Sequence, residues 1–324
     1  MDIIVEKLNY IWPFLAVITP VVFFHELGHY LVARANRVSI EVFSIGFGPE
    51  LFGINDRSGT RWKFCLLPLG GYVKFLGDSN AASTTPGKNT EQMSAEEQAK
   101  CFHNKSVGQR SAVAVAGPLA NFILAIVIFA ILFATVGQQV TPAIVGAVVS
   151  DSAAEEAGLV AGDEFIQING QEISRFEDIQ ATVQMNLGDE LDVVVLRNGT
   201  EVELRATPRM IAAQDTFGNE TQRPMLGISV PQVAFIQHDP GTAIWQAVKQ
   251  TVYVITASGK AVGQMIGGSR STSDLGGPIR IAVMSSQVAA SGIAGLAFFL
   301  AVISISLGLI NLVPIPVLDG GHLL

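Results

Sequence analysis

The sequence predicts an α-helical polytopic membrane protein with an inserted α+β domain and a cytoplasmic-side β-hairpin region. The first observation is composition: of the 324 residues, 49% are hydrophobic and only 15% are charged, whereas about a quarter are charged in an ordinary soluble domain. The second is that three apolar runs each reach the roughly 20 helical residues that cross a bilayer. The third is that the segments between them differ in the sign of their charge. Together these features argue against a water-soluble enzyme.

Three apolar runs form the predicted membrane-spanning helices, and they cover residues 8–33, 113–136 and 293–313. The first run is expected to stay in the mature protein, because its start is not net positive and no small-residue cleavage site follows it. We therefore divide the chain into a first transmembrane helix (1–33), a cytoplasmic-side β-hairpin region with a polar loop (34–111), a second transmembrane helix (112–136), an α+β domain (140–232), amphipathic helices (241–292), and a third transmembrane helix with the end of the chain (293–324).

Charge is distributed unevenly along the chain. There are 20 Lys or Arg against 28 Asp or Glu, a net charge of -8, and no stretch is rich in basic residues. Nucleic acid is therefore not expected as a partner. Residues 33–111 hold ten basic and seven acidic residues, whereas residues 137–240 hold five and sixteen. Because basic segments stay on the cytoplasmic side, we expect residues 34–111 inside, and both residues 137–292 and the amino terminus outside.

The cytoplasmic-side region contains two short β-prone runs, at residues 43–49 and 66–75, which are interrupted by Gly and Pro. This pattern favours hairpin strands over helix. Between residues 78 and 105 the composition becomes polar, which indicates a mobile connection.

The segment after the second apolar run has the pattern of a compact α+β domain. Asn198-Gly199 is a strong hairpin-turn signal, and the S-x-x-E pattern predicts helix starts at Ser152 and Ser174. Gly158 is well placed to end the first of these helices. The expected strands are residues 143–149, 164–169, 191–196 and 200–206.

This domain resembles a PDZ domain of the kind attached to bacterial proteases. The resemblance rests on S-A-A at 152–154, A-G-L at 157–159, G-D-E-F-I at 162–166 and I-N-G at 168–170. It implies that Leu226, Gly227 and Ile228 form the apolar-Gly-apolar segment that holds a peptide end, placed last as in a permuted version. Because a PDZ domain adds an extended chain to a sheet edge, peptide ends are expected partners.

Residues 242–266 carry apolar side chains at helical spacing, with Lys249 and Lys260 among them. The segment is predicted either as an amphipathic helix on the membrane face or as a helix packed on a neighbouring domain. After Gly277 and Pro278, residues 279–290 form a further helix-like run.

An H-E-x-x-H motif, His25-Glu26-Leu27-Gly28-His29, lies within the first apolar run. Helical residues four apart share a face, so both imidazoles can reach one zinc ion while Glu26 points at a water molecule. Ionisable groups at membrane depth are costly unless paired or coordinated, and a metal cation is the simplest partner for three of them. The alternative is that both histidines face a polar gap between helices, with Glu26 neutral or in an ion pair.

A third ligand is expected near the end of the chain, because catalytic zinc usually has three protein ligands and one open position. Asp319 is the acidic residue beside the third apolar run. Pro314 and Pro316 would disrupt a continuing helix, and unwound backbone at membrane depth is tolerated where it lines a cavity. The sequence therefore predicts Asp319 as the third ligand. The alternative is a Pro/Gly exit turn with Asp319 as a surface cap.

Together, these features resemble the site-2 protease family of intramembrane zinc metalloproteases, and within it the bacterial regulator-of-sigma-E proteases. The resemblance rests on H-E-x-G-H in a first transmembrane helix, N-x-x-P-x-P-x-L-D-G-G in a late one and a PDZ-like domain between them, and it extends to residues 116–122 and the hairpin at 68–72. It implies a Zn²⁺ cofactor held by His25, His29 and Asp319, with Glu26 as general base, and with Asn311 and Asn121 either holding substrate backbone or orienting the site. For the two asparagines, the alternative is a hydrogen bond from helix to helix only.

The resemblance also implies a function: cleavage of transmembrane segments of single-span proteins in regulated intramembrane proteolysis. Substrates of the anti-sigma factor or signal-peptide type are expected, in the bacterial inner membrane, with the PDZ-like domain on the periplasmic side. Because a helix hides its carbonyls, the substrate must be locally extended. We expect it to pair with the hairpin edge at Gly71, Tyr72 and Val73.

Two departures from the family pattern are visible. The outer segment has room for one PDZ-like domain rather than a tandem pair. The chain also stops at Leu324, where family members continue into a further transmembrane helix, so we expect either that the sequence is truncated there or that this helix is absent. One alternative function is a membrane-tethered PDZ scaffold with a non-catalytic metal site. Another is a zinc enzyme that acts on a lipid-linked group.

Overall fold

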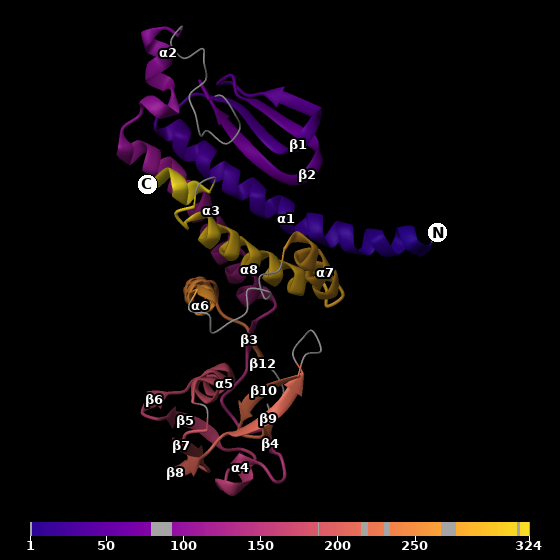
Figure 1. Cartoon of the computed structure of the whole chain (residues 1–324), viewed down its shortest axis with the longest axis vertical. Helices are drawn as coiled ribbons and strands as arrows, with labels where there is room; N and C mark the ends of the chain where they lie inside the picture. The colour runs from indigo at the N-terminus through magenta and orange to yellow at the C-terminus, as the bar shows by residue number, and fades with distance from the viewer. Residues whose placement is uncertain are drawn as a thin grey trace. The chain divides into compact units, whose positions relative to one another are not determined.

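The computed structural model describes residues 2–78, 93–186, 188–214, 220–229, 234–266, 277–315 and 318–323. Its contacts divide the chain into two compact units. We call residues 1–136 with 238–324 the helical unit, and residues 137–237 the α+β domain. Figure 1 labels the elements of both units.

The helical unit contains the three apolar runs as helices. Residues 10–35 of α1, all of α3 and all of α8 are long and apolar enough to cross a membrane, as the composition predicts. A capping box between Ser106 and Gln109 begins α3. The elements of this unit are α1 (Asp2–Ala35), β1 (Ile40–Asn55), β2 (Arg61–Phe75), α2 (Ala95–Lys100), η2 (Phe102–Asn104), α3 (Val107–Thr135), α6 (Pro240–Ile266), α7 (Pro278–Ala289), α8 (Ile293–Asn311) and η4 (Asp319–Leu323).

Helix α3 packs against α1, α6 and α8. Small residues allow two of these approaches. A Cβ on Gly28 of α1 would overlap the carbonyl oxygen of Ala116, and one on Gly308 of α8 would lie 2.9 Å from the Phe122 ring. Backbones that come this close hold the side chains between them in fixed positions.

Strands β1 and β2 form an antiparallel hairpin that lies alongside α1 in Figure 1. Both strands are longer than the two β-prone runs, and several bulges interrupt their register. Phe43 is fully buried between the hairpin and the helix. It stacks on Trp62 at 4.1 Å between ring centroids and meets Tyr30 edge-on at 5.6 Å.

The polar connection after the hairpin is only partly as expected. Residues 79–92 lie outside the described residues. From Ser94, however, the chain forms α2 with a complete capping box to Glu97, and then η2. Phe102 of η2 stacks on Phe75 at the end of the hairpin. The prediction of a mobile connection is therefore wrong for residues 94–105, whose polar composition belongs to a short exposed helix.

The α+β domain is built on a four-stranded antiparallel sheet in the order β6-β5-β7-β8. Phe165, Ile168, Leu191 and Val195 are among the side chains that form its buried core. The elements are β3 (Gln138–Val140), β4 (Ala147–Val148), α4 (Ala153–Glu156), β5 (Glu164–Ile168), β6 (Gln171–Glu172), α5 (Phe176–Met185), β7 (Leu191–Arg197), β8 (Thr200–Ala206), β9 (Arg209–Gln214), β10 (Glu220–Met225), β11 (Ile228–Ser229) and β12 (Ala234–Ile236).

Two local predictions for this domain need correction. The strand expected at 143–149 is reduced to β4, with one isolated bridge at Ile144, because the other residues do not form a continuous ladder. The second helix begins one residue later than expected, since the Asp178 carboxylate accepts the backbone N–H groups of Ser174 and Arg175. The first helix start is confirmed, because the Ser152 hydroxyl accepts the N–H of Glu155.

The amphipathic segment forms α6, and the following run forms α7, as predicted. Ala243 and Ala247 of α6 are buried against the core of α3 and α8. This face of α6 agrees with the second of the two predictions, a helix that packs on neighbouring parts of the protein. Ile244 and Trp245 are exposed, and for them contact with the membrane stays a prediction.

Candidate active site

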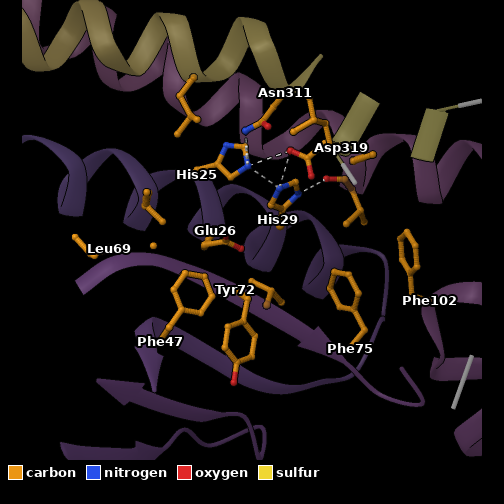
Figure 2. Close-up of a pocket in the computed structure, with 18 residues that line it drawn as sticks. His25, Glu26, His29, Phe47, Leu69, Tyr72, Phe75, Phe102, Asn311 and Asp319 are labelled. Carbon is orange, nitrogen blue, oxygen red and sulfur yellow. Dashed lines mark hydrogen bonds and ion pairs between the residues drawn. The ribbon is translucent and has the colours of Figure 1, made fainter. Parts of the chain in front are cut away.

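Helix α1 places the two histidines of the H-E-x-x-H motif on its face toward α3, and both are buried. Asp319 reaches the same point from η4, after the chain has left α8 (Figure 2). His25 Nε2 lies 3.0 Å from Asp319 Oδ2, His29 Nε2 lies 3.3 Å from the same oxygen, and the two nitrogens are 3.2 Å apart. Three potential ligand atoms from distant parts of the sequence therefore form one small triangle.

The size of this triangle fits a zinc ion. Tetrahedral ligands at typical zinc distances are about 3.3 Å from one another. Oδ2 of Asp319 is buried without a hydrogen bond, so it keeps lone pairs for a cation. An ionised carboxylate at this position would bind a cation together with the two imidazoles.

The other ring nitrogen of each histidine faces α3. His29 Nδ1 lies 2.8 Å from the carbonyl oxygen of Val113, which fixes a proton on Nδ1 and leaves Nε2 free as a ligand. His25 Nδ1 lies 3.2 Å from the side-chain amide of Asn121. The amide oxygen of Asn121 is buried without a hydrogen bond, and a flip of this amide would bring it to His25 Nδ1 as an acceptor.

Gly117 of α3 provides the space for both imidazoles. A Cβ at this position would overlap His29 Nε2 and would lie 2.8 Å from His25 Cε1. Only the absence of a side chain lets α3 approach the rings this closely. Sequence reasoning missed the roles of Gly117 and Val113 in the site, because a glycine and a backbone carbonyl in an apolar helix carry no chemical signature of their own.

A pocket of about 450 Å³ opens beside the triangle. Glu26 and Asn311 line it, and the Asn311 amide nitrogen lies 3.4 Å from His25 Nε2. The hairpin forms the opposite wall in Figure 2. Aromatic side chains line that wall and the neighbouring η2, a feature that the sequence did not reveal: Phe47, Tyr72, Phe75 and Phe102.

The edge of β2 faces the catalytic motif. Gly71, Tyr72 and Val73 all line the pocket, as does Glu26. A Cβ on Gly71 would lie 3.2 Å from Cγ of Glu26. The hairpin residues predicted from the sequence therefore share one pocket with Glu26.

Two other groups of predicted site residues lie elsewhere. Asn121 is fully buried behind His25 and is not among the described residues that line the pocket. Leu226, Gly227 and Ile228 belong to the α+β domain, where the backbone carbonyls of the first two accept hydrogen bonds from Ala154 and Val149. Gly227 has a φ of 82°, and a Cβ there would overlap Ser152.

Comparison with known proteins identifies the family. The model of peptidase family M50 matches residues 13–324. The chain belongs to this family, the site-2 proteases. Its relatives include a protein of Mesorhizobium japonicum that is named as a candidate zinc metalloprotease, 44% identical over 96% of this chain and 86% of the relative. Metalloprotease MmpA of Caulobacter vibrioides is 38% identical over 95% of this chain and 83% of the relative.

This M50 peptidase is a zinc metalloprotease of the membrane, and its triangle of His25, His29 and Asp319 suits that metal. Among solved structures, the PDZ domain of the SdrC-like protein from Listeria monocytogenes matches 28% of this chain and 87% of its own, at 20% identity. The TM-score is 0.23, which is too low to establish a shared fold.

Proposed function

We propose that this M50 peptidase cleaves transmembrane segments of single-span membrane proteins, with His25, His29 and Asp319 as zinc ligands. The observation that carries the proposal is the convergence of these three side chains beside a pocket at the level of an apolar helix. Bound zinc supplies a Lewis acid that acidifies water and polarises a peptide carbonyl. Glu26 lines the same pocket, where its carboxylate accepts the proton of the attacking water and returns it to the leaving amine.

The substrate is an extended segment that adds to the edge of β2. Residues 71–73 line the pocket beside Glu26, and backbone pairing with a strand edge binds a peptide without regard to its side chains. The aromatic wall accepts the substrate's apolar side chains, and Asn311 holds its backbone beside His25. Tyr72→Pro would disturb the backbone of this edge and should slow turnover while the metal content stays unchanged.

Asn121 orients His25 in this proposal, one of the two roles that the sequence left open. It is buried behind the imidazole rather than in the pocket, so it cannot touch substrate there. An amide that accepts the Nδ1 proton fixes the tautomer whose Nε2 binds metal.

The α+β domain acts as a PDZ-like module on the periplasmic side of the bacterial inner membrane and selects substrates by their peptide ends. Residues 137–240, which include this domain, have an excess of acidic residues, whereas residues 33–111 have an excess of basic ones. This difference supports the orientation. Anti-sigma factors and residual signal peptides are the single-span substrates that we propose.

The test is Glu26→Gln in the full chain, with a single-span test substrate in lipid vesicles. Cleavage should be lost while metal analysis still finds one zinc per chain, since the substituted amide keeps the shape of the side chain but accepts no proton. Glu172→Gln is the matched control, because Glu172 is exposed in the α+β domain. Unchanged cleavage by Glu26→Gln would contradict the role of Glu26 as general base, whereas no cleavage by the wild-type protein would favour the membrane-tethered scaffold with a non-catalytic metal site.

A further inference from the structure

One face of α1 contacts the hairpin at two points, one helical turn apart. Glu26 and Tyr30 are four residues apart and so share this face. Glu26 meets Gly71 near the end of β2, where a Cβ on the glycine would lie 3.2 Å from Glu26 Cγ. Tyr30 meets Asp56, in the turn between β1 and β2, with its hydroxyl donating to Asp56 Oδ2 at 2.6 Å.

The two carboxylate oxygens of Asp56 accept hydrogen bonds from different parts of the structure. Oδ1 accepts the backbone N–H groups of Ser58 and Thr60 at 2.8 and 3.0 Å, and thereby closes the turn. Oδ2 faces outside the turn, where it accepts from Tyr30 and, at 3.3 Å, from the indole N–H of Trp62. Arg34, one turn after Tyr30 on α1, lies 3.7 Å from the same oxygen. A single carboxylate therefore fastens the hairpin turn to the catalytic helix.

The groups around this contact leave the Tyr30 ring little freedom. The ring is buried, meets Trp62 edge-on at 5.1 Å between centroids, and also meets Phe43 edge-on. Burial raises the pKa of Asp56, but hydrogen bonds from Ser58, Tyr30 and Thr60 outweigh it and leave the pKa well below its usual range. The acceptor stays charged at neutral pH, and a hydrogen bond to a charged acceptor is stronger than a neutral one.

We propose that Tyr30 and Asp56 are positioning residues, which set the register of β2, and of a substrate paired with it, relative to Glu26. This inference rests on the proposed function, because it assumes that substrate pairs with residues 71–73. Neither residue is among those that line the pocket within the described chain. Both act at a distance, through the helix turn that joins Tyr30 to Glu26 and through the strand that joins Asp56 to Val73.

Tyr30→Phe is the sharpest test, because it removes one hydroxyl and keeps the ring between Phe43 and Trp62. We expect kcat to fall about tenfold, since misplacement of the reacting groups by a fraction of an ångström is costly. Metal content should stay at the wild-type value. Mass spectrometry of the products should show new cleavage at neighbouring peptide bonds, because a loosened strand presents the substrate in more than one register.

Two further variants sharpen this test. Tyr10→Phe is the matched control, because Tyr10 is exposed on the same helix, and it should leave kcat and the cleavage site unchanged. Asp56→Asn keeps an acceptor for the turn but replaces the oxygen that faces Tyr30. If the two residues act through one hydrogen bond, the double variant should be no slower than the slower single variant.

Loss of kcat at an unchanged cleavage site, with a matching loss of metal, would mean simple destabilisation and would overturn the proposal. Amide hydrogen exchange separates this inference from the proposed function, because it needs no activity. Residues 71–73 should exchange faster in Tyr30→Phe than in Tyr10→Phe. Equal exchange would overturn the positioning role even in a preparation that cleaves nothing, whereas a wild-type protein without cleavage would contradict only the proposed function.

Discussion

Each of the two units contains a buried carboxylate, and the two carboxylates differ in their hydrogen-bond partners. In the α+β domain, Asp163 is fully buried and both of its oxygens are satisfied: Arg197 donates to each at 2.8 Å, and the N–H of Val160 donates to one at 2.9 Å. In the helical unit, Oδ2 of Asp319 is buried without a hydrogen bond. The first carboxylate is fully satisfied within the protein, whereas the second faces two imidazole nitrogens at 3.0 and 3.3 Å. This contrast supports the role of metal ligand that we propose for Asp319.

The largest effect expected from this contrast is that of Asp319→Ala. It should lower cleavage by more than about a hundredfold and abolish tight metal binding, because two imidazoles alone leave the site incomplete. Metal analysis and a cleavage assay on the same preparation provide the measurement. Asp163→Ala is the counterpart in the other unit and should keep the metal. Retention of tight zinc by Asp319→Ala would remove the distinction between the two carboxylates.

A smaller effect is expected for Gly117→Ala. Its Cβ would overlap His29 Nε2, so the imidazoles must move and zinc affinity should fall by about 10- to 100-fold. A competition titration with a chelator measures this affinity. Gly108→Ala, at the start of the same helix, is the control, because a Cβ there meets nothing within 4 Å. Equal affinities for the two variants would show that the close approach of α3 is not required.

The smallest effect concerns acid stability of the α+β domain. Burial raises the pKa of Asp163, but its hydrogen bonds with Arg197 and Val160 outweigh burial and lower it. Because the folded pKa lies below the unfolded value of about 3.9, the stabilisation is present above about pH 4 and is lost as the pH falls below it. Hydrogen exchange of β5 and β7 between about pH 5 and 3 should show this loss. Asp163→Asn should flatten the dependence; an unchanged slope would assign acid sensitivity elsewhere.

The sequence predicted those parts of the site that depend on local spacing. His25 and His29 share a helical face at any i and i+4 positions, and Pro314 points to unwound backbone before Asp319. It did not predict the contacts that depend on how two helices approach each other, such as Val113 with His29. These are set by tertiary packing, to which an apolar helix gives no local signal.

The fold, like the site, was predictable where it depends on local sequence and not where it depends on tertiary packing. The Asn198-Gly199 turn fixed β7 and β8 locally, and both strands lie where the sequence placed them. The start of α5 was misplaced by one residue because Glu177 and Asp178 offer equivalent carboxylates, and only the final packing selects Asp178. The strand at 143–149 was predicted too long, because most of its residues bond to neighbouring chain through separate hydrogen bonds, such as that from Val145 N–H to Asp163, rather than through one continuous ladder.

The separation of the ligands along the chain has a consequence for biosynthesis. His25 and His29 leave the ribosome early, whereas Asp319 follows only after the α+β domain has been translated. Until Asp319 is translated, the zinc centre that we propose lacks one of its three ligands. A chain that is still being inserted should therefore have little hydrolytic activity.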